Sequence, residues 1–131
     1  MRRHKYADAR SKRIDFWLGF IAWFVGNAIG LFVLSRVSFE GQQLAQGLLV
    51  LANIATLIAL SVTRSFAALG LLTAFAVMFG AVVLGGIFFT LGDFVAAGGG
   101  GGGALAVWAL GAVLIPILAI VALVFIHRGI K

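Results

Sequence analysis

Long apolar runs separated by short polar segments dominate the pattern along this chain of 131 residues. The runs cover residues 16–34, 44–62, 66–90 and 104–126, and none of them contains a charged residue. The hydrocarbon core of a bilayer is about 30 Å thick, and a helix needs about 20 apolar residues to cross it. The pattern therefore predicts four transmembrane helices at about these positions.

The segments between the predicted spans are short. They cover residues 35–43, 63–65 and 91–103, and a basic segment of residues 1–15 precedes the first span. Short connections make sequential helices antiparallel neighbours. We therefore expect an all-α membrane protein in which residues 1–131 form a single transmembrane domain, a four-helix up-down bundle.

Composition supports a lipid environment. Hydrophobic residues make up 63% of the chain and charged residues 11%, whereas about a quarter of the residues in a soluble domain are charged. A small soluble domain exposes too much surface to cover such an apolar surplus. The chain has no cysteine, so disulfides and thiolate metal sites are excluded.

The basic residues lie on one side of the four-span arrangement. Lys and Arg in short loops are retained on the cytoplasmic side of a membrane, and only Arg36 falls on the other side. We expect both termini in the cytoplasm and the chain in the cytoplasmic membrane of a prokaryote. Anionic lipid headgroups are a candidate partner of the N-terminal tail. The residues that determine this topology are Arg2, Arg3, Lys5, Arg10, Lys12, Arg13, Arg64, Arg128 and Lys131.

Six consecutive glycines occupy residues 98–103, between the third and fourth apolar runs. Helical glycine in the hydrocarbon costs about 1 kcal/mol per residue relative to alanine, and unpaired backbone there costs more. Both costs vanish in water. We therefore expect residues 91–103 to form a slack, glycine-rich external loop that acts as a linker.

Small residues recur at helical spacing in the spans, where they permit close approach of neighbouring backbones. The first span carries Gly19, Ala22, Gly26 and Gly30 at spacings of three and four, and Gly26 to Gly30 is a GxxxG match. The third span carries Gly70, Ala74, Val77, Ala81 and Gly85, and the fourth carries Ala109, Ala112, Pro116, Ala119 and Ala122. We expect these faces to pack against other helices.

The second span instead carries a polar stripe, Gln42, Gln46, Asn53, Thr56 and Thr63, which we expect to face inward. Asn27 lies about 16 Å from the inner boundary and Asn53 about 14 Å from the outer one, at 1.5 Å per residue. These depths nearly coincide in a core of about 30 Å. We predict a hydrogen bond between Asn27 and Asn53, or, in its place, one from the Trp23 indole to Asn27.

Ionisable residues form no catalytic or metal-binding cluster in this pattern. The acidic residues are predicted outside the hydrocarbon or at its edge, and the histidines lie beside basic termini. We predict no catalytic residue, no metal ligand, no cofactor, no enzymatic activity and no nucleic-acid partner. The acidic residues and histidines considered for this prediction are Asp8, Asp15, Glu40, Asp93, His4 and His127.

Size and span count are similar to those of small multidrug antiporters, whose hallmark is an acidic residue embedded in the first helix. Asp15 lies too near the end of the first span to match that pattern. Small fluoride channels also have four spans, but their phenylalanine- and threonine-rich pore motif has no counterpart here. Neither family is assigned.

Three functions remain open at this point. The first is a non-enzymatic accessory or assembly-partner subunit that binds another membrane protein or a second copy of itself. The second is a passive pore or small-solute transporter lined by Gln46, Asn53 and Thr56. The third is a holin-like protein that permeabilises the membrane.

Overall fold

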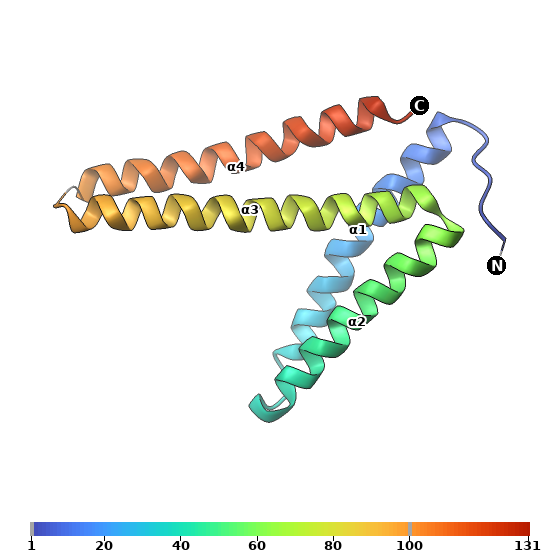
Figure 1. The fold of residues 1–131 in the computed structure, drawn as a ribbon, viewed down its shortest axis with the longest axis horizontal. Coiled ribbons are helices and arrows are strands. Elements are labelled where there is room, and N and C mark those ends of the chain that lie inside the picture. Colours follow the sequence, from blue (N-terminus) through green and yellow to red (C-terminus); the bar gives the residue numbers. More distant parts are fainter. Residues whose placement is uncertain (1, 100) are drawn as a thin grey trace. The chain divides into compact units, whose positions relative to one another are not determined.

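The computed structural model describes residues 2–99 and 101–131, and these residues form four helices and no strand (Figure 1). The helices are α1 (Ala9–Leu34), α2 (Phe39–Thr63), α3 (Ser65–Ala97) and α4 (Gly101–Gly129). Each is long and apolar enough to cross a membrane. The predicted all-helical class with four apolar helices is confirmed, while orientation and insertion stay predictions.

Close contacts divide the chain into two compact units. The first comprises Met1–Phe75 with Ile130–Lys131, and the second comprises Ala76–Gly129. The first unit therefore holds α1, α2 and the beginning of α3, and the second holds the rest of α3 with α4. Assembly into a single bundle domain stays a prediction.

The first helix begins well before the apolar run, because Asp8 caps it. The Asp8 carboxylate accepts a hydrogen bond from the Ser11 backbone N–H at 2.8 Å, and the Ser11 hydroxyl in turn accepts one from the Asp8 N–H at 3.5 Å. This is a capping box, which satisfies N–H groups that a helix start leaves unpaired. The hydrogen bond from Ser11 also lowers the pKa of Asp8. Part of the predicted basic tail is therefore helical.

Two glycines bring α1 against the beginning of α3 in the first unit. A Cβ atom added at Gly19 would collide with the Ala67 backbone, and one added at Gly70 would collide with the Phe16 backbone. Phe16 and Ala74 are fully buried beside this crossing. Neither backbone can move away cheaply, so glycine is required at these two positions.

In the second unit, the last part of α3 packs against the first part of α4 as an antiparallel pair. A Cβ atom at Gly103 would lie 3.0 Å from Val95, and one at Gly111 would lie 2.6 Å from Phe88. Between these contacts the Trp108 indole covers Gly92. Successive contacts move back along α3 as they move forward along α4. Large side chains therefore fill gaps that glycines leave on the facing helix.

The expected slack loop over residues 91–103 is wrong for most of its length. The third helix runs to Ala97 and ends with hydrogen bonds from Gly98 N to Phe94 O and from Gly99 N to Ala96 O. Gly99 has φ +84°, a conformation that favours glycine. Gly101, Gly102 and Gly103 form the first turn of α4, so this part of the glycine run is helical as well. Gly100 lies outside the described residues.

Several small residues expected at helix contacts do not make them among the described residues. A Cβ atom at Gly26 or Gly85 would meet nothing within 4 Å. Pro116 is exposed on α4, as are Ala109 and Ala112. Spacing along one helix identifies a face of small residues, but the position of the neighbouring helix decides which face is buried. In α4 the buried face carries Ala104 and Gly111.

Replacing Gly19 and Gly26 by alanine, one at a time, tests this packing within a single helix. We expect Gly19→Ala to destabilise the protein by about 1–3 kcal/mol, because its methyl group meets Ala67 backbone. Gly26→Ala places the methyl in open space and should be neutral or stabilising by up to about 1 kcal/mol. Thermal unfolding in detergent measures both. Equal effects of the two substitutions would contradict the close α1–α3 crossing.

Candidate functional site

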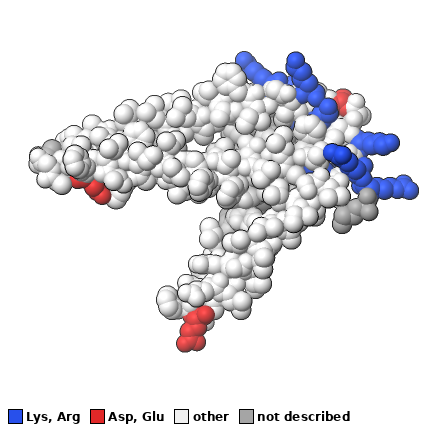
Figure 2. All heavy atoms as spheres, viewed as in Figure 1, with Lys and Arg blue, Asp and Glu red and all other residues white. Residues whose placement is uncertain are grey.

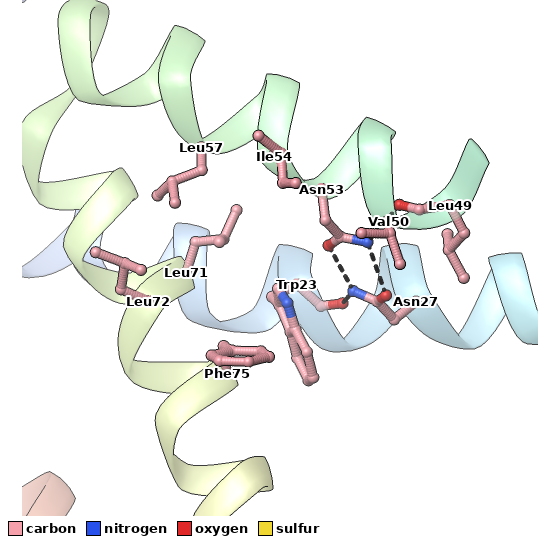
Figure 3. Close-up of a pocket in the computed structure, with 10 residues that line it drawn as sticks. All are labelled: Trp23, Asn27, Leu49, Val50, Asn53, Ile54, Leu57, Leu71, Leu72 and Phe75. Carbon is pink, nitrogen blue, oxygen red and sulfur yellow. Dashed lines mark hydrogen bonds between the residues drawn. The ribbon is translucent and has the colours of Figure 1, made fainter. Parts of the chain in front are cut away.

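The predicted hydrogen bond between Asn27 and Asn53 is present, direct and reciprocal. Asn27 Nδ2 donates to Asn53 Oδ1 at 3.0 Å, and Asn53 Nδ2 donates to Asn27 Oδ1 at 3.0 Å (Figure 3). The two residues come from facing positions of α1 and α2, and both side chains are half-buried. The amides therefore join the two helices at the depth at which the sequence places them together.

All four N–H donors of this asparagine pair are used. The second donor of Asn27 bonds to the Trp23 carbonyl at 2.8 Å, and that of Asn53 bonds to the Leu49 carbonyl at 2.9 Å. Each amide oxygen has two lone pairs, and the partner amide occupies one of them. The pair thus has accepting capacity left and no donating capacity.

Trp23 packs beside the pair without bonding to it through its ring. Its indole lies edge-on to Phe75, with ring centroids 6.3 Å apart, and edge-on to Phe24. Asn27 donates to the Trp23 backbone carbonyl, so the alternative hydrogen bond from the Trp23 indole to Asn27 is not formed. The indole N–H makes no hydrogen bond to any described residue.

An apolar pocket of about 450 Å³ lies next to the asparagine pair in the first unit. Its walls come from α1, α2 and the first part of α3, and Figure 3 shows Trp23 and Phe75 below the pair with Leu71 beside them. Pockets for small ligands have volumes of about 300–1,000 Å³, apolar walls and a few placed polar groups. This pocket has those properties.

The rest of the polar stripe does not extend into a polar path. The Thr56 hydroxyl donates to the Ala52 carbonyl of its own helix at 2.8 Å, and Thr63 bonds likewise to Ala59. Gln46 is exposed, contrary to the expectation that it faces inward, whereas Thr56 lines a second pocket between α1 and α2 together with Asn27 and Asn53. A threonine bonded to its own helix can face lipid without leaving its hydroxyl unsatisfied.

A second polar cluster lies where α1 begins and α2 meets α3. Asp15 is only 4% exposed, and Arg64 Nη1 donates to its Oδ1 at 3.1 Å. The Tyr6 hydroxyl donates to Asp15 Oδ2 at 2.8 Å and accepts from the Phe66 N–H at 3.2 Å. A buried carboxylate needs such compensation, and here each oxygen receives a hydrogen bond.

The N-terminal segment is bound across the connection between α2 and α3. His4 N donates to the Thr63 carbonyl at 2.7 Å. Tyr6 then packs edge-on between His4 and Phe66, with ring centroids 4.9 and 5.0 Å away. Part of the segment expected to be a plain basic tail is thus fixed in place.

Sequence reasoning missed this cluster, although a signal was available. The predicted topology puts Asp15 at the inner end of the first span and Arg64 in the short turn on the same side. Opposite charges at one boundary are candidates for an ion pair. Asp15 was considered only as a catalytic carboxylate, and the tail tyrosine was not considered at all.

The basic residues of the N-terminal segment gather at this end of the first unit, whereas Arg36 lies at the other end of the α1–α2 hairpin. Figure 2 shows Lys and Arg side chains clustered where α1 begins and an acidic side chain at the opposite end of the α1–α2 hairpin, where Glu40 lies. Arg2, Arg3, Lys5 and Arg10 are exposed. Lys12 Nζ instead bonds to the Lys131 backbone oxygen at 2.8 Å, and Arg13 Nη2 lies 3.4 Å from the Ile130 carbonyl.

No group of three or more potential metal ligands occurs among residues 2–99 and 101–131. The site therefore consists of a polar pair beside an apolar pocket and a charged cluster at one end of the hairpin.

Comparison with protein-family models, with curated proteins and with solved structures finds no match to this chain.

Titration of Tyr6 tests the charged cluster. Burial raises the pKa of Tyr6, and the Asp15 carboxylate that accepts its hydrogen bond raises it further. The neutral phenol is thus the bound form, so docking is complete below the ordinary tyrosine pKa of about 10 and is lost as pH rises through the higher folded value. Because the chain has one tyrosine, tyrosinate absorbance in detergent measures Tyr6 alone.

We expect Asp15→Asn to lower this pKa, since it removes the negative charge beside the phenol. Glu40→Gln removes a carboxylate at the far end of the hairpin and should leave the pKa unchanged. A wild-type pKa at the ordinary value, or one that does not respond to Asp15→Asn, would contradict the cluster.

Proposed function

We propose that the protein is a small, non-enzymatic integral protein of the prokaryotic cytoplasmic membrane, with both termini inside, and that it acts as an accessory or assembly-partner subunit. The observation that carries this proposal is the exposure of α2, which buries none of its residues although it is apolar enough to span a membrane. Within the first unit, such a helix has most of its surface free for a further membrane helix.

The surface of α2 suits a helix partner better than lipid alone. A Cβ atom at Gly47 would meet nothing within 4 Å, so a partner backbone can approach there. The Gln46 side chain is exposed and makes no hydrogen bond to any described residue, so a partner can supply one. A second copy of this chain or a different membrane protein meets both requirements.

The exposed basic residues at the start of the chain fit the inner surface of such a membrane. Binding of Tyr6 and His4 holds Lys5 between them at the end of the α1–α2 hairpin. Each basic residue near an anionic surface contributes about 1 kcal/mol of attraction. We propose headgroup contact as a secondary role of this segment.

The pore and the holin-like protein stay predictions of the sequence. A pore along the second span would need Asn53 and Thr56 to present free polar groups to a path. In the structure Asn53 donates to Asn27 and Leu49, and Thr56 donates to its own helix. These contacts support packing of the stripe rather than permeation.

Native mass spectrometry of the protein released from its own membrane tests the subunit proposal. We expect a complex heavier than the 13.7 kDa chain. Gly47→Leu fills the open face of α2 and should weaken the complex roughly fivefold, equivalent to about 1 kcal/mol of helix contact. Gly129→Leu, also in open space but beyond the predicted fourth span, is the matched control. A wild-type protein found only as a free single chain under mild conditions would contradict the proposal.

A further inference from the structure

We propose that the pocket beside the asparagine pair binds a long-chain alcohol, an apolar molecule with one hydroxyl group, that enters from the lipid. This goes beyond the subunit role, because it assigns a small-molecule ligand to the interior of the first unit. The inference rests on the hydrogen-bonding capacity that the pocket leaves open, on its apolar walls and on its depth.

The polar part of the pocket selects a donor. The side-chain amides of Asn27 and Asn53 donate all four of their N–H groups to each other and to two backbone carbonyls. Each amide oxygen keeps one free lone pair. A ligand therefore gains a hydrogen bond from the asparagine pair only by donating one. Ketones, esters and carboxylates cannot donate, whereas a hydroxyl group can.

Trp23 completes the match to a hydroxyl. Its indole N–H, which bonds to no described residue, is the remaining side-chain donor among the residues that line the pocket. A hydroxyl oxygen accepts a hydrogen bond while its proton is donated, so it can use the indole and an amide oxygen. Figure 3 shows the Trp23 indole between Phe75 and the asparagine pair.

The remaining walls suit a hydrocarbon chain. Leu71 is buried at the base, while Ile54, Leu72 and Phe75 are about half exposed at the rim. In a bilayer these rim residues face acyl chains, so the ligand arrives through the lipid and leaves most of its chain there. The volume of about 450 Å³ accommodates the hydroxyl end and several methylene groups.

The predicted depth of the asparagine pair in the bilayer favours this ligand over ordinary phospholipids. The asparagine pair is predicted near the bilayer midplane, about 15 Å from either boundary. A phospholipid keeps its polar headgroup at the boundary, and its acyl chains carry no donor. A neutral molecule with a single hydroxyl can reach the midplane, where an unpaired hydroxyl is unfavourable and a partner for it is valuable.

Quenching of Trp23 fluorescence in liposomes tests the proposal with the full chain. The probes are a long-chain alcohol brominated near its hydroxyl and the alkane brominated at the same carbon, compared at equal concentration in the bilayer. Subtracting the signal of Trp23→Phe from that of the wild type isolates Trp23 without altering the other two tryptophans.

We expect the brominated alcohol to quench Trp23 saturably and roughly fivefold more strongly than the alkane, as one net hydrogen bond predicts. Unbrominated alcohol should relieve the quenching. Ile54→Phe fills the pocket without touching the asparagines and should abolish the difference between probes. Thr63→Val removes a hydroxyl on the same helix that lines no part of this pocket and should preserve it.

Equal quenching by the two probes would overturn the proposal, because the pocket would then hold hydrocarbon without regard to the hydroxyl. A preference for the alcohol that survives both Ile54→Phe and Leu72→Phe would also overturn it, since the alcohol would be bound elsewhere. Both variants fill the pocket, Ile54→Phe from α2 and Leu72→Phe from α3, so a folding defect in one variant leaves the other as the test.

Discussion

The hydrocarbon of a bilayer offers no hydrogen bonds, and the described helices are built in a way that meets this constraint. Backbone groups in lipid must be paired within the chain, and helices achieve this without a partner segment. The same constraint applies to side chains along the apolar stretches. Asn27 and Asn53 satisfy each other, and Thr56 bonds to the carbonyl of Ala52. Asn27, Asn53 and Thr56 are therefore satisfied within the chain, whereas Gln46 bonds to no described residue.

Close packing holds the helices of each unit together. Apolar contact alone cannot do this in a bilayer, because lipid chains are as apolar as the helices. Gly19 and Gly70 let the backbones of α1 and α3 touch, and Phe16 is buried at that crossing. In the second unit, Trp108 and Phe88 cover Gly92 and Gly111. Glycine therefore has two uses in this chain. At a crossing it admits a backbone, and along a hairpin it admits an aromatic ring from the neighbouring helix.

Element positions and one specific contact could be predicted from the sequence. Apolar run length locates the four helices, and counting residues from each boundary places Asn27 opposite Asn53. Packing faces could not be predicted, since spacing on one helix does not reveal where its neighbour lies. Gly26 therefore looked equivalent to Gly19 and is not. The helical ends of the glycine-rich segment could not be predicted, because intrinsic helix propensity is a weak guide that the surrounding structure overrides.

The central claim is that the chain crosses a membrane four times with both ends inside, and cysteine labelling tests it most directly. The chain has no cysteine, so single cysteines can be placed at Ala7, Ser38, Ala97 and Lys131. An impermeant maleimide added to intact cells should label Ser38→Cys and Ala97→Cys, and should label the other two only after the membrane is opened. Labelling of Ala7→Cys or Lys131→Cys in intact cells would contradict the account.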